Sequence, residues 1–144
     1  MWKSIATFVF AGLCLAAAPA MAQNAASSKQ IDISKAGATP QEHQAFVKAM
    51  SPQQQAAVIE ACVPVIVKPA ADTPPAVAAF CKTVGTTGVP AAGTTAADNA
   101  SFVKGLPADE QANLKAVCVP VVAQPADASG PTMLITFCKN VTGS

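Results

Sequence analysis

Cysteine is the residue type with the clearest capacity for chemistry in this sequence. Of the 5 cysteines, Cys14 lies in the N-terminal segment, and the other four, Cys62, Cys81, Cys118 and Cys138, form two pairs separated by 19 and 20 residues. Zinc sites and thiol–disulfide enzymes draw on close cysteine pairs such as Cys-x-x-Cys, and the sequence contains none. We therefore predict no metal and no redox catalysis, and expect these four cysteines to form two disulfides.

Four cysteines can pair in three ways, and the spacing favours Cys62–Cys81 with Cys118–Cys138. If each pair lies on two antiparallel helices joined by a turn, both cysteines lie about 9–10 Å from that turn at about 1.5 Å per residue. Their Cα atoms can then approach within the roughly 4.4–6.8 Å that a disulfide needs. The alternative, Cys62–Cys118 with Cys81–Cys138, would suit two halves related by a pseudo-twofold axis.

His43 is the only histidine of the chain and is therefore the first candidate for acid–base catalysis. Nucleophilic catalysis would also need a Ser or Cys and an orienting acid brought to it by the fold. Its position beside Glu42, in the first turn of a predicted helix, is typical of a solvated side chain. We therefore predict no enzyme and no cofactor, and keep an enzyme that uses His43 as an alternative.

The elements that carry these residues belong to two similar stretches, 46–84 and 102–141. Phe46 and Cys62 recur 56 positions later, and Phe80 and Cys81 recur 57 positions later. Each stretch has roughly 40 residues, a size at which a hydrophobic core rarely suffices without a covalent staple. The duplication therefore predicts two small units, each closed by one disulfide.

Hydrophobic spacing predicts that these stretches are helical. Val58, Ala61, Cys62 and Val65 lie at i, i+3, i+4 and i+7, and the other three cysteines share this pattern. Helix starts are predicted at Thr39-Pro40, Ser51-Pro52, Thr73-Pro74, Asp98, Leu106-Pro107 and Gly130-Pro131, with a stop at Gly85. A strand through Cys62–Val67 is disfavoured by Pro64. We predict an all-α fold of two tandem disulfide-stapled helical-hairpin repeats, about three helices each, in a small helical bundle.

The domain boundaries follow from composition. Lys3, an apolar run and Ala20-Met21-Ala22 predict a signal peptide over residues 1–22, cleaved near Gln23; a retained membrane anchor is the alternative. Next come a disordered lead over 23–38, repeat 1 over 39–85, a Gly/Thr/Ala/Pro linker over 86–97 and repeat 2 over 98–144. We expect a periplasmic or secreted protein with no membrane span after cleavage.

The charge and the aromatic content of the chain exclude two classes of binding partner. Without Lys3, the remaining lysines balance the 8 acidic residues, and the chain has no arginine and no tyrosine. Nucleic acids and anionic membranes attract basic surfaces, so we exclude both as partners. We expect a protein partner bound through a rigid helical surface. The alternative is a carrier of an apolar ligand, such as a lipid or fatty acid, held between hairpins lined by Phe46, Phe80, Phe102 and Phe137.

Overall fold

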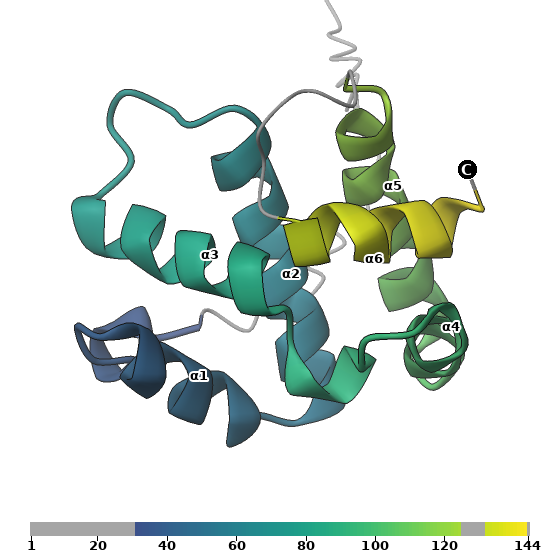
Figure 1. Ribbon diagram of the computed structural model, residues 1–144, viewed down its shortest axis with the longest axis horizontal. Coiled ribbons are helices and arrows are strands. Elements are labelled where there is room, and N and C mark those ends of the chain that lie inside the picture. The colour runs from purple at the N-terminus through teal and green to yellow at the C-terminus, as the bar shows by residue number, and fades with distance from the viewer. Residues whose placement is uncertain (1–30, 125–131, 144) are drawn as a thin grey trace, which may run out of the picture.

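The computed structural model describes residues 31–124 and 132–143. These residues form six α-helices and two short 3-10 helices, with no strand among them (Figure 1). In chain order the elements are η1 (Ile33–Lys35), α1 (Pro40–Lys48), α2 (Pro52–Val67), α3 (Pro75–Thr87), η2 (Pro90–Ala92), α4 (Ala96–Lys104), α5 (Ala108–Val122) and α6 (Thr132–Thr142). The predicted all-α class is therefore confirmed.

Local capping explains where α1, α2 and α4 begin. Thr39 and Ser51 each form the predicted capping box, in which the side chain accepts a hydrogen bond from the third helical N–H and the third side chain accepts one in return. α4 begins two residues before the predicted Asp98, because Thr95 is the N-cap and Asp98 completes its capping box. The predicted start at Gly130-Pro131 lies outside the described residues.

The predicted stop of α3 at Gly85 is wrong. Gly85 is buried inside the helix, which continues to Thr87 and ends at Gly88. Gly88 has a φ of 72°, a left-handed conformation that glycine adopts without steric penalty. Packing carries the helix past Gly85, and it ends where the chain turns into the left-handed region.

The two disulfides have the predicted pairing, but the helices that each one joins cross at a large angle and do not lie antiparallel as predicted (Figure 1). Cys62–Cys81 joins α2 to α3, and Cys118–Cys138 joins α5 to α6, each with Cα atoms 5.0 Å apart. All four cysteines are buried. Disulfides of this kind indicate an oxidising, extracellular environment, and no helix in the described part of the chain is long and apolar enough to cross a membrane.

The two halves, residues 31–87 and the described residues 88–124 with 132–143, share one hydrophobic core. α2 packs against α5 and α3 packs against α6, and the buried apolar side chains form a single cluster. α2 and α5 run in the same direction, and so do α3 and α6 (Figure 1). A twofold axis cannot preserve both directions, so the two halves are not related by a twofold axis. The two halves therefore meet through different faces.

Two segments expected to lack regular structure are packed parts of the fold. The described part of the predicted disordered lead contains η1 and the buried Ala36, and the predicted linker contains η2 with the buried Val89 and Ala92. These segments are themselves copies, because Ala36-Gly37-x-Thr39 recurs 56 positions later as Ala92-Gly93-x-Thr95. Each ends in a glycine with positive φ and a threonine that caps the next helix. Residues 23–30 lie outside the described residues.

Candidate functional site

His43 is buried, which corrects the expectation of a solvated side chain. Only 4% of the residue is exposed. It lies one helical turn before Val47 on the face of α1 that packs against α3, and these two residues are the buried ones of that helix. The prediction failed because it placed His43 by its distance from the helix start and not by its face.

The imidazole of His43 links three segments of the first half. Nε2 lies 3.3 Å from the carbonyl oxygen of Gly37, and Nδ1 lies 3.1 Å from Oγ1 of Thr83 on α3. The ring also packs edge-on against Phe80, with ring centroids 5.3 Å apart. A carbonyl can only accept, so Nε2 carries a proton, and in the neutral ring Nδ1 accepts from the Thr83 hydroxyl. The single proton of that hydroxyl has a competing acceptor, the Ala79 carbonyl oxygen at 3.1 Å, and it can be donated to only one of the two at a time.

A hydroxyl beside an imidazole resembles the start of a nucleophilic site, but the parts that would activate it are engaged elsewhere. The second ring nitrogen faces a backbone carbonyl where catalytic triads place a carboxylate. The neighbouring carboxylate of Glu42 accepts hydrogen bonds from the backbone N–H groups of Ala38 and Thr39 and from the Thr39 hydroxyl. These bonds, led by the one from Ala38, lower the pKa of Glu42. Glu42 is therefore a capping group of α1.

The second half shows what this polar link does. His43 and Thr83 correspond to Asn99 and Asn140, which lie 56 and 57 positions later. Asn99 is buried and donates to the carbonyl oxygen of Ala92 at 2.7 Å, and Asn140 donates to Oδ1 of Asn99 at 2.7 Å. The same three segments are joined, but two amides cannot perform acid–base catalysis. The function common to both pairs is to hold the first helix of each half against the third.

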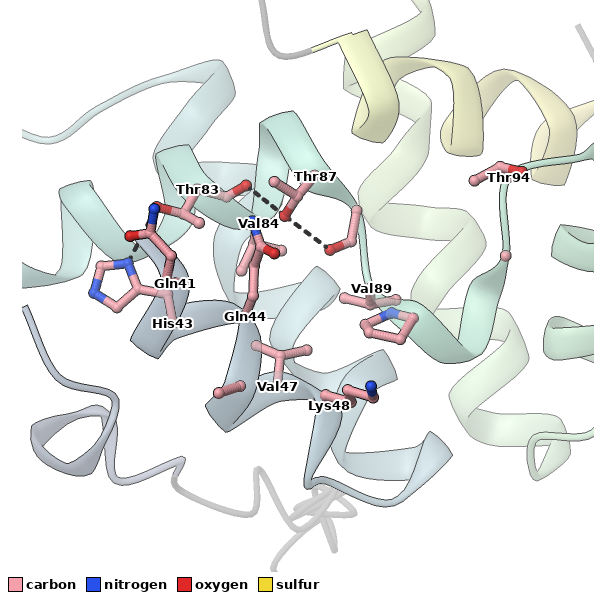
Figure 2. A pocket seen from close by; sticks show the side chains of 14 residues that line it. Gln41, His43, Gln44, Val47, Lys48, Thr83, Val84, Thr87, Val89 and Thr94 are labelled. Atoms are coloured by element: carbon pink, nitrogen blue, oxygen red, sulfur yellow. Dashed lines mark hydrogen bonds between the residues drawn. The ribbon is translucent and has the colours of Figure 1, made fainter. Parts of the chain in front are cut away.

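A groove opens beside the His43–Thr83 link, between α1, α3 and η2, with a volume of about 360 Å³. In Figure 2, His43 and Thr83 lie at one end of the groove, Val47 and Val84 lie in the middle, and Lys48 and Val89 lie toward the other end. The lining also includes Gln41, Gln44, Ala45, Thr87, Gly88, Pro90, Gly93 and Thr94. The three valines are buried and form an apolar floor. Exposed amide, hydroxyl and ammonium groups form the rim.

The phenylalanines are packed side chains of the core. Phe80, Phe102 and Phe137 are buried and Phe46 is half-buried. They form two edge-to-face pairs, Phe46–Phe80 and Phe102–Phe137, with ring centroids 6.2 and 6.1 Å apart. The cavity between the two halves that Phe137 lines has a volume of only about 20 Å³, enough for about one water molecule. Phe102 also lines an open depression of about 610 Å³ between α2, η2 and α4, so the alternative of an apolar ligand stays a prediction.

The acidic residues give no sign of a metal centre. Within residues 31–124 and 132–143, no group of three or more His, Cys, Asp or Glu side chains could hold a metal ion. Glu60 has a raised pKa, first because burial disfavours its charge and then because the charges of Glu110 and Asp109 repel it. Repulsion among these three carboxylates lowers stability and offers no ligand geometry.

Comparison with known proteins gives no guide to function. No protein-family model matches the chain, and neither a curated protein nor a solved structure matches it. The groove therefore has to be interpreted from its own residues.

Proposed function

We propose that this chain is an exported, non-enzymatic module that binds a protein partner, and that the groove between α1 and α3 is its binding site. One observation carries the proposal: Asn99 and Asn140 replace His43 and Thr83 at the same place in the second half. The link on the wall of the groove therefore has a structural role. This leaves a preformed depression with an apolar floor and a polar rim, the usual composition of a recognition site.

The size and chemistry of the groove fit a peptide segment. A volume of about 360 Å³ accommodates one or two side chains of moderate size. Val47, Val84 and Val89 would contact an apolar side chain, and the exposed Gln41 and Gln44 offer both donors and acceptors to a peptide backbone. Lys48 on the rim favours a segment with a carboxylate beside its apolar residue.

Rigidity supports the same proposal. The α3 wall is bonded to α2 through Cys62–Cys81, three residues before Val84. A wall fixed before binding loses less conformational freedom when a partner arrives, and this preorganisation raises affinity. We also propose that the module is a tandem duplication, with one disulfide-closed hairpin in each half, and that residues 1–22 are removed on export, so that the mature chain begins near Gln23.

Crosslinking from the groove in the native compartment tests the binding proposal. A photo-reactive amino acid at Gln44 should give one discrete adduct with a second protein, because Gln44 is exposed and lines the groove. The same group at Ala61, an exposed position of α2 outside the groove, should not give that adduct. A second substitution, Ala45→Arg, should suppress the Gln44 adduct by filling the groove. An identical adduct pattern from Gln44 and Ala61 would contradict the proposal.

A further inference from the structure

Helix α2 is buried on two faces. Val58 and Cys62 lie on the face that meets α3. Ala56, Ile59 and Val63, at i, i+3 and i+7, lie on a second face and are also buried. Ile59 lines the small cavity shared with η2 and α6 of the second half. The second face of α2 is therefore the surface on which the second half sits.

In helix α5, the residues that correspond to the first face of α2 are buried, whereas those that correspond to the second face are exposed. Leu114 and Cys118, which correspond to Val58 and Cys62, are buried. The residues that correspond to Ala56, Ile59 and Val63 are Ala112, Lys115 and Val119, and all three are exposed. Val119 is 57% exposed, although its counterpart Val63 is buried. We call Ala112, Lys115 and Val119 the α5 face.

The second half covers α2 mainly with α5, and residues of η2 and α6 complete the cover beside Ile59; the first half carries the counterparts of these last residues. The cavity beside Ile59 is lined by Gly88, Val89, Met133 and Leu134 of the second half. Their counterparts, 56 or 57 positions earlier, are Asp32, Ile33, Ala76 and Val77. Asp32 and Ala76 are exposed, and Ile33 and Val77 are half-buried. We call these four residues the N-terminal face.

Because the halves are not related by a twofold axis, they meet through different faces, and the contact between them can be repeated from one molecule to the next. Such a contact would place the N-terminal face of one chain on the α5 face of another, and the two faces differ, so the association is head to tail. The charges fit this arrangement. Ile59 and Gly88 line the same small cavity within the chain, so the repeated contact places their counterparts Lys115 and Asp32, two exposed residues of opposite charge, in the same interface.

We propose that the α5 face binds the N-terminal face of a second copy of this chain, with the geometry that joins the two halves within one chain. The exposed Val119 takes the place of Val63 in that contact, and Lys115 pairs with Asp32 of the second copy. Neither face includes a residue that lines the groove, so this self-association and the binding of another protein are independent.

Sedimentation of the purified, disulfide-bonded chain tests the proposal with two complementary variants. Val119→Asp blocks the α5 face, and Asp32→Lys blocks the N-terminal face. The wild-type chain should form species larger than a dimer as its concentration rises, and each variant alone should associate at least about tenfold more weakly. An equimolar mixture should form a heterodimer and stop there, because it restores one intact contact and leaves the other ends blocked.

The folding of each variant is checked by its circular dichroism and melting temperature. Asp32 accepts a hydrogen bond from the backbone N–H of Ser34 at the start of η1, so Asp32→Asn provides a second variant that can keep this bond while removing the charge. It should weaken association severalfold at low salt, and the difference should shrink at high salt. A wild-type chain that stays monomeric up to about 1 mM, or single variants that still dimerise by themselves, would overturn the proposal.

Discussion

Replacing His43 tests the central interpretation, that its link to Thr83 is structural. In the His43→Ala variant, Thr83 loses one partner and the carbonyl oxygen of Gly37 loses its side-chain donor. A typical hydrogen bond contributes about 0.5–1.5 kcal/mol to stability, so the loss of these two part-buried bonds lowers the free energy of unfolding by about 1–3 kcal/mol. Loss of the edge-on contact with Phe80 adds about 0.5–1.5 kcal/mol. We expect the free energy of unfolding to fall by about 2–4 kcal/mol.

The second half supplies a matched rescue. The double variant His43→Asn/Thr83→Asn copies the pair Asn99 and Asn140, which forms the corresponding link in the second half. If the position needs only a hydrogen-bonded bridge between α1 and α3, this variant should regain at least half of the stability that His43→Ala loses. Equilibrium unfolding in guanidinium chloride, with constant denaturant slopes across the series, measures both quantities.

Two results would refute this reasoning. A loss below about 0.5 kcal/mol in His43→Ala would mean that the buried hydrogen bonds contribute little to stability, well outside the expected range. A stable double variant that no longer forms the Gln44 adduct in the native compartment would show that the imidazole itself acts on the partner. The first result concerns the fold and the second the function, so the two are read separately.

Three further perturbations test other parts of the fold. Cys118→Ala/Cys138→Ala opens a loop of 20 residues and should lower the free energy of unfolding by about 3 kcal/mol; a loss below about 1 kcal/mol in denaturant unfolding would contradict it. Burial raises the pKa of Glu60 above its usual 4.5, with Glu110 adding to the effect, so its charge destabilises the folded state above that raised pKa, and the penalty disappears as pH falls toward 4.5. Glu60→Gln should therefore raise the melting temperature at pH 7 and have little effect near pH 4, and an equal effect at both pH values would exclude this cause. Pro107 is the N-cap of α5 and offers no side-chain cap, and Oε2 of Glu110 is buried without a hydrogen bond. Pro107→Ser should create a capping box with Glu110 and raise the free energy of unfolding by about 1 kcal/mol. If Glu110→Ala in the same background leaves that gain intact, the capping box is not its cause.

Local sequence patterns were enough to predict the helical class, the starts of α1 and α2, and the disulfide pairing. Helix starts depend on a few neighbouring residues, such as Thr39 with Glu42, and a capping box can be recognised without tertiary information. The pairing could be predicted because the two cysteines of each pair are separated by only 19 or 20 residues and lie on consecutive helices. The antiparallel arrangement assumed for those helices was wrong (Figure 1), because their crossing angle depends on packing against the other half.

The burial of His43 and the packing of the two connecting segments depend on contacts between residues far apart in the chain. Gly37 and Gly93 look like flexible positions by composition, yet each has positive φ and lies directly against the acidic side chain of the following capping box. One signal in the sequence could have shown this: the repeat extends upstream of Phe46, through Ala36-Gly37-x-Thr39 and through the register of His43 with Asn99. The groove itself could not be predicted, because it forms only where α1, α3 and η2 meet.

The placement of the cystines determines how the molecule would respond to a protease. Each disulfide closes within one half, so only the backbone between Gly88 and Thr95 connects the halves covalently. A single cut in that segment would produce two looped peptides that remain together through their common apolar interior and separate in denaturant, even without a reducing agent. In an uncut chain the two halves stay covalently linked in denaturant. When the denaturant is removed, each half meets the other at a high effective concentration, which favours refolding.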